Sequence, residues 1–475
     1  MNIIGRKQEQ ILLMDCVNSG RPEFLAVYGR RRVGKTYLIR EYFGRNFAFY
    51  VTGIADEKMK GQLRVFHESL KEYGCPDRKV PKDWLEAFSR LKALLRSERV
   101  RKDPASGRIV VFIDELPWLD TPRSDFKAAL DWFWNSFASA EKEILLIVCG
   151  SATSWIINNL LSDRGGFHNR ITRQLFLRPF HLSECEEYYK AAGIEFSRRQ
   201  LFESYMIFGG IPYYMDCMDR RLSLAQNIEA VCFDENGQLH YEFSRLYSSL
   251  FRHSERHLAI IRMLAEKKCG MTRTELAKNK AIGDGEALTE ALLELTQCGF
   301  IRKYQLYQKN KYGSLYQLID PFTLFALTYM ESGKRQSWIA VLGTPGYYAW
   351  SGYAFELLCL LHVDEIKKAL GITGMESAYC AWRAGGSTGH PGAQIDLLID
   401  RRDDVINLCE MKYSEAPYEI TEKYEQELLR KVTVFRTETG TKKAIHLTMV
   451  TSSGLQKNMH SGIILNEITG DDLFS

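Results

Sequence analysis

The sequence lacks any apolar run of the ~18–20 residues that a membrane-spanning helix needs. The apolar stretch at 321–330 is too short, and we expect a buried helix there. Residues 1–6 carry no apolar core of the kind that marks a signal peptide. The eleven cysteines form no CxxC pair and no metal-like spacing, which is typical of reduced intracellular thiols. These absences predict a cytoplasmic protein that does not enter a membrane.

A strong charge of either sign is also missing. The chain has 63 Lys and Arg against 59 Asp and Glu, a net charge of +4 and a pI of about 8.3, too mild to indicate nucleic acid or membrane binding by itself. The charge is uneven, however. Residues 1–335 hold 50 basic and 41 acidic residues, whereas 336–475 hold 13 and 18. The C-terminal part therefore presents a different kind of surface.

What is present is a globular composition over 475 residues, enough for two to four domains. Short apolar runs read as buried strands and alternate with helical patterns, which predicts an α/β domain with a parallel sheet covered by helices. The expected strands are 24–28, 47–51, 108–113 and 144–149, and the expected helices are 37–42, 56–73 and 83–96. We place this domain at 1–180.

One loop carries the strongest chemical signal in the sequence. It fits the pattern G-x-x-x-x-G-K-[ST], follows a predicted strand and opens a predicted helix: Gly29, Arg30, Arg31, Arg32, Val33, Gly34, Lys35 and Thr36. Such a loop turns its backbone N–H groups toward phosphate oxygens, and the helix N-terminus favours anions. Lys35 would neutralise the β and γ phosphates, and the Thr36 hydroxyl suits Mg²⁺. Tyr37, the next residue, is also expected to bind the nucleotide. The alternative is a basic surface turn.

Acidic and polar residues at neighbouring strand ends would complete an ATP site. Asp114 would hold Mg²⁺ and Glu115 would polarise the attacking water; the alternative is an ordinary strand-end turn. Ser151, after the next strand, could sense the γ-phosphate or simply end that strand. Arg170 or Arg173 could reach the γ-phosphate in cis or from another subunit, or could form surface ion pairs.

The segment after this domain changes character. Helical periodicity dominates 181–245, the predicted helical lid. Within 246–335, helices at 255–267, 273–279 and 285–298 and strands at 300–306 and 315–319 predict a winged helix-turn-helix. Three glutamates repeat along one face of the helix that would read DNA: Glu286, Glu290 and Glu294. Because carboxylates repel phosphates, we favour a regulatory or docking role over DNA reading, although basic residues flank the helix and occupy the wing, including Lys303, Lys309 and Lys311.

A second set of carboxylates lies in the predicted C-terminal domain, 336–475, after a linker at 336–350 and an apolar helix at 355–370. Strands 394–400 and 405–411 carry Asp396, Glu410 and Lys412, and Glu410 and Lys412 share one face. With Glu356 on the preceding helix, these carboxylates could hold Mg²⁺, and Lys412 could orient or deprotonate a water for phosphodiester cleavage. The alternatives are a domain with a nuclease-like fold but no cleavage activity, and an ordinary amphipathic hairpin with a Glu410–Lys412 salt bridge.

These features together resemble the archaeal-type ATPase family of prokaryotes, related to the AAA+ and STAND P-loop NTPases. The resemblance rests on the phosphate loop, the acid pair and short motifs elsewhere: Ile4-Gly5-Arg6, Gly150-Ser151, Asn169-Arg170 and Gly209-Gly210-Ile211-Pro212. It implies that Gly5 and Arg6 lie near the adenine and that Pro212, in the lid, closes over the base. The family has Gly-Arg where this chain has Asn169-Arg170. The C-terminal segment resembles the PD-(D/E)xK nuclease superfamily.

Two functions follow as hypotheses. In the first, ATP binding and hydrolysis switch the lid and winged helix and so control a Mg²⁺-dependent nuclease acting on DNA. In the second, the chain is a slow nucleotide switch or scaffold whose C-terminal domain only binds a protein partner or supports self-association. The expected cofactors are ATP and Mg²⁺.

Overall fold

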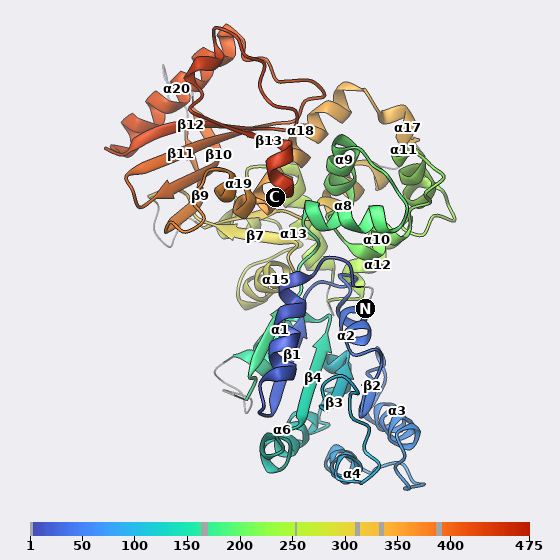
Figure 1. Ribbon diagram of the computed structural model, residues 1–475. Helices are drawn as coiled ribbons and strands as arrows, with labels where there is room; N and C mark the ends of the chain where they lie inside the picture. Colours follow the sequence, from blue (N-terminus) through green and yellow to red (C-terminus); the bar gives the residue numbers. More distant parts are fainter. Residues whose placement is uncertain (1–2, 163–169, 252–253, 309–313, 332–336, 386–391) are drawn as a thin grey trace. The chain divides into compact units, whose positions relative to one another are not determined.

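The structure is a computed structural model that describes residues 3–162, 170–251, 254–308, 314–331, 337–385 and 392–475 (Figure 1). The chain divides into two compact units, residues 1–179 and residues 180–475. Each unit is described by itself below. No helix in the described ranges is long and apolar enough to cross a membrane.

The first unit is built on a five-stranded sheet in the order β2-β3-β4-β1-β5, in which every pairing is parallel. The strands are β1 (Glu23–Tyr28), β2 (Phe49–Thr52), β3 (Ile109–Asp114), β4 (Ile144–Gly150) and β5 (Arg173–Phe176). The helices are α1 (Lys7–Asn18), α2 (Lys35–Tyr42), α3 (Met59–Glu72), α4 (Trp84–Leu95), α5 (Leu116–Leu119), α6 (Phe126–Ser136) and α7 (Thr153–Ile156). The predicted α/β fold with a parallel sheet is confirmed.

The sheet runs parallel because helices connect its strands, so both faces of the sheet are covered. The strands β3 and β4 are buried along their whole length. Aromatic side chains fill the layer between the sheet and helices α3, α4 and α6, with Trp84 packed edge-on against Phe66 and Phe126. This large apolar layer holds the strand ends rigidly, and those ends carry the site.

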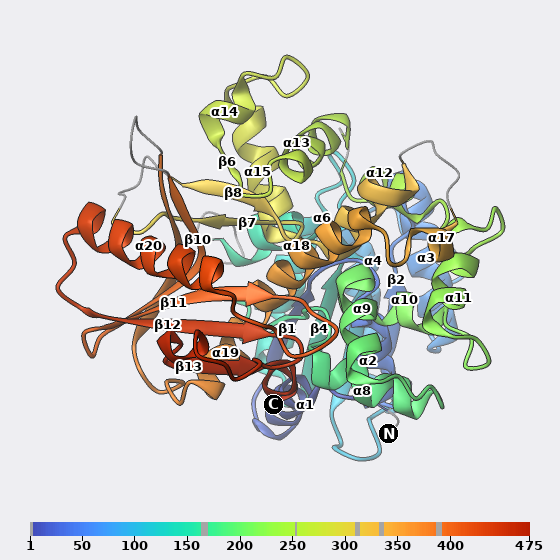
Figure 2. The ribbon, with the colours of Figure 1, turned by 90° about the horizontal axis from the view of Figure 1, so that it is seen from above.

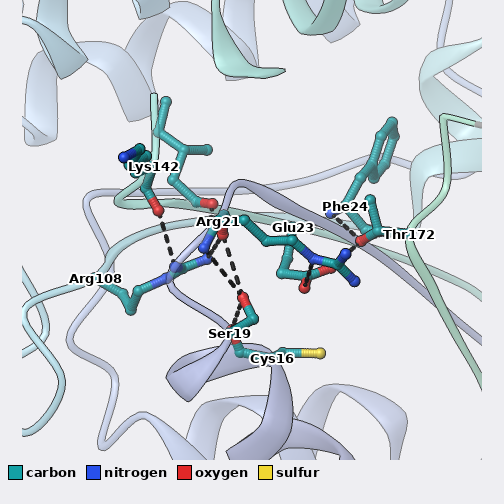
Figure 3. Close-up of polar contacts among 9 residues, drawn as sticks. Cys16, Ser19, Arg21, Glu23, Phe24, Arg108, Lys142 and Thr172 are labelled. Carbon is teal, nitrogen blue, oxygen red and sulfur yellow. Dashed lines mark hydrogen bonds and ion pairs between the residues drawn. The ribbon is translucent and has the colours of Figure 1, made fainter. Parts of the chain in front are cut away.

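A polar network fixes the opposite, amino-terminal ends of the strands (Figure 3). The Glu23 carboxylate is fully buried and accepts hydrogen bonds from Arg21 and Thr172. The Arg108 guanidinium donates to the carbonyls of Arg21, Lys142 and Ile144 at 2.9–3.0 Å. The starts of β1, β3 and β4 and the residue before β5 are therefore joined by charge-assisted bonds, which set the strand register.

The second unit begins with helices, as predicted for 181–245: α8 (Leu182–Ala191), α9 (Arg198–Phe208), α10 (Pro212–Asp216), α11 (Leu224–Ile228), the π-helical η3 (Glu229–Phe233) and α12 (Glu242–Ser248). Next come α13 (Ser254–Glu266), β6 (Met271–Thr272), α14 (Arg273–Ala277), α15 (Glu286–Gln297), β7 (Ile301–Tyr304) and β8 (Leu315–Leu318). The three strands form an antiparallel sheet in the order β6-β8-β7. Thr272 and Glu275 form a capping box at the start of α14.

The three glutamates of α15 differ in their surroundings. Glu286 and Glu290 are exposed. Glu294 instead turns toward α13, where its carboxylate lies 2.8 Å from Nε2 of the buried His257. The predicted wing residues Lys309 and Lys311 lie outside the described residues.

The predicted linker at 336–350 is also wrong. This stretch holds α17 (Trp338–Val341) and the first turns of α18 (Pro345–Leu361). Proline is tolerated in the first turn of a helix, and the Thr344 hydroxyl caps the helix by accepting the N–H of Tyr347 at 3.2 Å. The predicted apolar helix at 355–370 is divided between α18 and α19 (Val363–Ala369), which meet at His362. The apolar stretch at 321–330 forms the buried α16 (Pro321–Phe325) and the π-helical η5 (Ala326–Met330).

The C-terminal part of this unit is a five-stranded mixed sheet in the order β13-β12-β11-β10-β9 (Figure 2). The strands are β9 (Ser377–Ala384), β10 (Ala393–Arg401), β11 (Val405–Lys412), β12 (Ala444–Thr451) and β13 (Asn466–Thr469). Strands β9, β10 and β11 are antiparallel, and β12 and β13 continue parallel to β11. Helix α20 (Glu422–Thr439) joins β11 to β12 and buries Leu428 and Phe435 against the sheet. Two short 3₁₀ helices, η6 (Ser461–Ile463) and η7 (Gly470–Phe474), follow.

Candidate nucleotide and carboxylate sites

The phosphate loop joins β1 to α2, as its sequence predicted. Gly29 has φ +140, and a Cβ placed on it would lie 2.3 Å from the carbonyl oxygen of Leu177. Gly34 has φ +91 and is the residue before α2. Both positions need glycine, one for space and one for backbone conformation. Between them Arg30 and Val33 are buried, while Arg31 and Arg32 are half-buried.

The Lys35 side chain lies inside this loop. It is buried, and its ammonium donates to the carbonyl oxygens of Gly29 at 2.9 Å and Arg30 at 2.8 Å. A positive charge is thus held at the carbonyls of a loop whose type binds phosphate oxygens through its backbone N–H groups. Tyr37, two residues further along α2, is 54% exposed and is available at the surface.

Asp114 and Thr36 meet across the site. The Thr36 hydroxyl donates to Asp114 Oδ2 at 2.8 Å, although 78 residues separate them in sequence. Burial raises the pKa of the Asp114 carboxyl, against the hydrogen bond from Thr36, and the nearby charge of Glu115 raises it further. A hydroxyl and a carboxylate oxygen in contact are a donor set that Mg²⁺ accepts, and a divalent cation would offset the charge that burial disfavours.

Glu115 and Ser151 also contact each other. Glu115 follows β3 in a left-handed conformation with φ +45. Its carboxylate accepts the Ser151 hydroxyl at 2.7 Å and the Ser151 backbone N–H at 3.2 Å. Ser151, which is expected to contact the γ-phosphate, therefore hydrogen-bonds Glu115, which is expected to activate water.

Arg6 is tied to the phosphate loop by its side chain. Its buried guanidinium donates to the carbonyl of Val33 at 3.1 Å and to the carbonyl of Arg178 at 2.7 Å. Gly5 and Arg6 both have positive φ, and the Gly5 carbonyl accepts the amide of Gln10 at 2.8 Å. These contacts fix the N-terminal segment against the loop; a contact of Gly5 or Arg6 with adenine stays a prediction.

Arg170 and Arg173 are not brought to the loop by any contact within the described ranges. Arg170 pairs with Asp131 on α6, at 3.9 Å between Nε and Oδ1. Asn169 lies outside the described residues. Arg173 begins β5. Pro212 opens α10 in the second unit, where it is buried beside the tight turn of Gly209 and Gly210. Their nucleotide roles stay predictions.

In the C-terminal sheet, two of the predicted carboxylates line one cavity. The cavity has a volume of about 410 Å³, and Glu356 of α18 and Asp396 of β10 face it together with Gln394 and Lys268. Burial and the nearby charge of Asp396 together raise the pKa of Glu356 to about 7, while the charge of Lys412 opposes the shift. The charge of Glu410 also raises the pKa of Glu356. The four predicted residues therefore lie within electrostatic reach of one another.

Glu410 has a partner that the sequence did not reveal. Lys431 of α20 donates to Glu410 Oε1 at 2.6 Å, and the Tyr424 hydroxyl donates to Oε2 at 3.3 Å. The Lys412 ammonium lies over the Tyr424 ring, 5.2 Å from its centre. Glu410 therefore forms its salt bridge with Lys431, and not with Lys412 as in the alternative that we considered. Among the residues that the structure describes, no three Asp, Glu, His or Cys side chains are gathered closely enough to form a metal site.

Comparison with known proteins agrees with the first unit's geometry. Residues 5–217 match the sequence model of a family described as "ATPase domain predominantly from Archaea". This stretch of the chain is therefore similar in sequence to an ATPase domain. The match continues past Pro179 through α8, α9 and α10, so the domain's sequence pattern includes helices that the structure groups with the second unit.

Longer similarities extend beyond this domain. The chain is 23% identical over 442 residues to an uncharacterized protein of Methanocaldococcus jannaschii, covering 90% of this chain and 91% of that protein. It is similar in structure to the Walker-type ATPase PABY2304 of Pyrococcus abyssi, with a TM-score of 0.47 and 17% identity over 69% of this chain and 96% of that one. It is also similar to the RuvB Holliday junction branch migration motor of Thermotoga maritima, with a TM-score of 0.34 and 15% identity over 66% and 92%.

Sequence reasoning missed the partners of the predicted site residues more than the residues themselves. Lys268, Gln394, Tyr424 and Lys431 carry no motif. Lys431 follows Glu410 by many residues in sequence. The two side chains meet only because α20 crosses back over the sheet after β11. One signal was available: a lysine on a helix that follows a strand carrying buried carboxylates is a natural counter-charge.

Proposed function

We propose that the ATPase domain binds and hydrolyses ATP with Mg²⁺, and that its nucleotide state controls a Mg²⁺-dependent nuclease-like site in the C-terminal sheet. The observation that carries the first part is the 2.8 Å hydrogen bond between Thr36 and Asp114. It joins the end of the phosphate loop to the strand-end acid, the two groups that hold Mg²⁺ in P-loop enzymes.

Each residue then has a defined task. Bound Mg²⁺ would supply charge stabilisation for the phosphates, with Thr36 and Asp114 as its protein ligands. Lys35 binds the β and γ phosphates from within the loop. Glu115 accepts a proton from, or orients, the attacking water. The loop glycines allow the backbone N–H groups to approach the phosphates closely.

The C-terminal proposal rests on the cavity that Glu356 and Asp396 line. Two carboxylates facing one solvent-accessible cavity, with Lys412 and Lys268 nearby, suit a divalent cation and an anionic substrate. The mixed sheet with α18 before it and α20 across it also supports a PD-(D/E)xK-type domain. DNA is the substrate that this chemistry favours. For 246–335 we propose a winged helix with a regulatory or docking role, since Glu286 and Glu290 are exposed on α15.

The alternative function, a slow nucleotide switch, is favoured by one contact. Ser151 holds both oxygens of Glu115, so the carboxylate is engaged when it should be free to meet water. An enzyme of this kind would bind ATP firmly and turn it over slowly until a partner released Glu115.

This contact leads to a direct prediction. Ser151→Ala is expected to raise basal ATP turnover about tenfold, because a hydrogen bond to a charged group contributes about 1.5 kcal/mol and the variant removes the one from the hydroxyl. Steady-state phosphate release at saturating ATP measures the effect. Ser139→Ala, an exposed serine of the same unit, serves as the matched control. A fall in turnover with Ser151→Ala alone would instead support γ-phosphate sensing.

Two assays on the full chain test the proposed function as a whole. ATP-dependent phosphate release should require Mg²⁺ and stop in EDTA. Cleavage of DNA should also require Mg²⁺ and should change in rate when ATP is added. Phosphate release without any cleavage, across substrates and metals, would leave the ATPase proposal in place and favour the switch over the nuclease.

A further inference from the structure

The cavity beside Asp396 has features that the carboxylate chemistry does not explain. One wall is a single face of α18, formed by Tyr348, Ala349, Gly352, Tyr353 and Glu356. These positions recur at three- and four-residue intervals, so they lie along one side of the helix. A Cβ on Gly352 would meet no atom within 4 Å, so the middle of this wall is open. The carboxylate lies at one end of the wall and an aromatic ring at the other.

That ring belongs to Tyr348, which is 51% exposed although it is large and apolar. Its neighbour Tyr347 is buried and donates its hydroxyl to Glu203 at 3.1 Å, so it has a packing role. Within the part of the chain that the structure describes, the Tyr348 hydroxyl has no hydrogen-bond partner. An exposed aromatic ring at the lip of a polar cavity is a stacking surface, and every nucleobase has a face that can stack on it.

Lys268, from the turn between α13 and β6, also lines the cavity. The backbone of this turn is anchored: the Lys268 carbonyl accepts the Gln317 amide at 2.8 Å and the Tyr353 hydroxyl at 3.1 Å. The ammonium lies 4.8 Å from the centre of the Tyr353 ring. The side chain is exposed, so a fixed backbone presents a positive charge to the cavity.

We propose that this cavity receives an unpaired nucleotide of a nucleic-acid strand, with the base on Tyr348 and the phosphate beside Lys268. A strand held this way runs along α18 toward Glu356 and Asp396. The base must leave its partner strand to reach the ring, because a paired base presents only its edge. The inference rests on the proposed function of these carboxylates and deepens it: the substrate class is single-stranded or frayed nucleic acid rather than intact duplex.

Binding by the full chain tests this independently of cleavage. Fluorescence anisotropy is measured with a labelled single strand, as DNA and as RNA, and with the matching duplex, in Ca²⁺, and gels verify that the strands stay intact. The single strand should bind more tightly than the duplex. Tyr348→Ala should weaken single-strand binding by roughly 5- to 100-fold, the effect of losing one base–aromatic stack, and Tyr348→Phe should restore it.

Lys268→Ala should weaken binding and also lower the salt dependence, by about 0.7 in the slope of log K against log salt, which is the contribution of one phosphate contact on a single strand. A merely structural residue would not change that slope. Tyr379→Ala, an exposed tyrosine on β9, and Lys442→Ala, an exposed lysine before β12, are the matched controls and should behave as wild type.

The outcomes separate this inference from the proposed function. Equal binding of duplex and single strand, absence of binding to either, or a Tyr348→Ala variant that binds as well as Tyr379→Ala would each overturn it. Preferential single-strand binding that depends on Tyr348 and Lys268, without cleavage in Mg²⁺, would support it while removing the nuclease activity.

Discussion

Lys35→Ala is expected to lower ATP turnover by at least about 100-fold. Removing one preorganised donor from a charge-stabilising site costs about 2.7–4 kcal/mol in known enzymes, and Lys35 carries a full charge. Its ammonium already lies among the loop carbonyls of Gly29 and Arg30, so no other side chain needs to move for it to meet a phosphate. Phosphate release and the binding of a fluorescent ATP analogue measure the two consequences separately.

The control must separate loss of chemistry from loss of fold, because Lys35 is buried. Lys35→Met keeps most of the side-chain volume and should lose turnover equally, with a melting temperature close to that of the wild type. Lys7→Ala, an exposed lysine at the start of α1, should leave turnover unchanged. If Lys35→Ala or Lys35→Met kept full activity, the assignment of Gly29–Thr36 as the nucleotide site would be wrong.

The sequence could predict this candidate site because its pattern is local. The spacing of Gly29, Gly34 and Lys35 is imposed by the backbone geometry of one loop, and Asp114 is located by the end of an unmistakably apolar strand. The bonds between distant residues could not be derived in this way. The contact of Ser151 with Glu115 depends on β4 lying beside β3, and neither residue type specifies that neighbour.

Errors arose where local signals have two meanings. Gly343, Pro345 and Gly346 indicated a linker, yet a proline in the first turn and a threonine cap equally begin a helix. The resulting α18 carries one wall of the carboxylate cavity. Helical periodicity placed Glu294 on one face of α15, but it could not show that a buried histidine on α13 pairs with this residue, because that contact is tertiary.

Asp396→Asn is expected to lower Mg²⁺-dependent cleavage at least about 100-fold, while ATP turnover stays unchanged. An amide keeps the shape and the hydrogen bond from Gln394 but removes the negative charge that would hold a metal ion. Without the metal ion, the reaction loses a lowering of the barrier by several kcal/mol. Glu410→Ala should have a similar effect and should also leave Lys431 without its 2.6 Å partner, so this variant needs a melting curve beside the assay.

Asp400→Asn is the matched control for Asp396→Asn, because the same substitution is made four residues along the same strand. Asp400 accepts Lys443 at 2.7 Å and does not line the cavity, so its variant should cleave as the wild type does and at most lose a fraction of a kcal/mol of stability. Cleavage that survives in both Asp396→Asn and Glu410→Ala would show that a contaminating nuclease or a different site is responsible. Cleavage lost in Asp396→Asn but retained in Asp400→Asn would locate the reaction at the cavity, since charge reduction on β10 is common to both variants and only position differs.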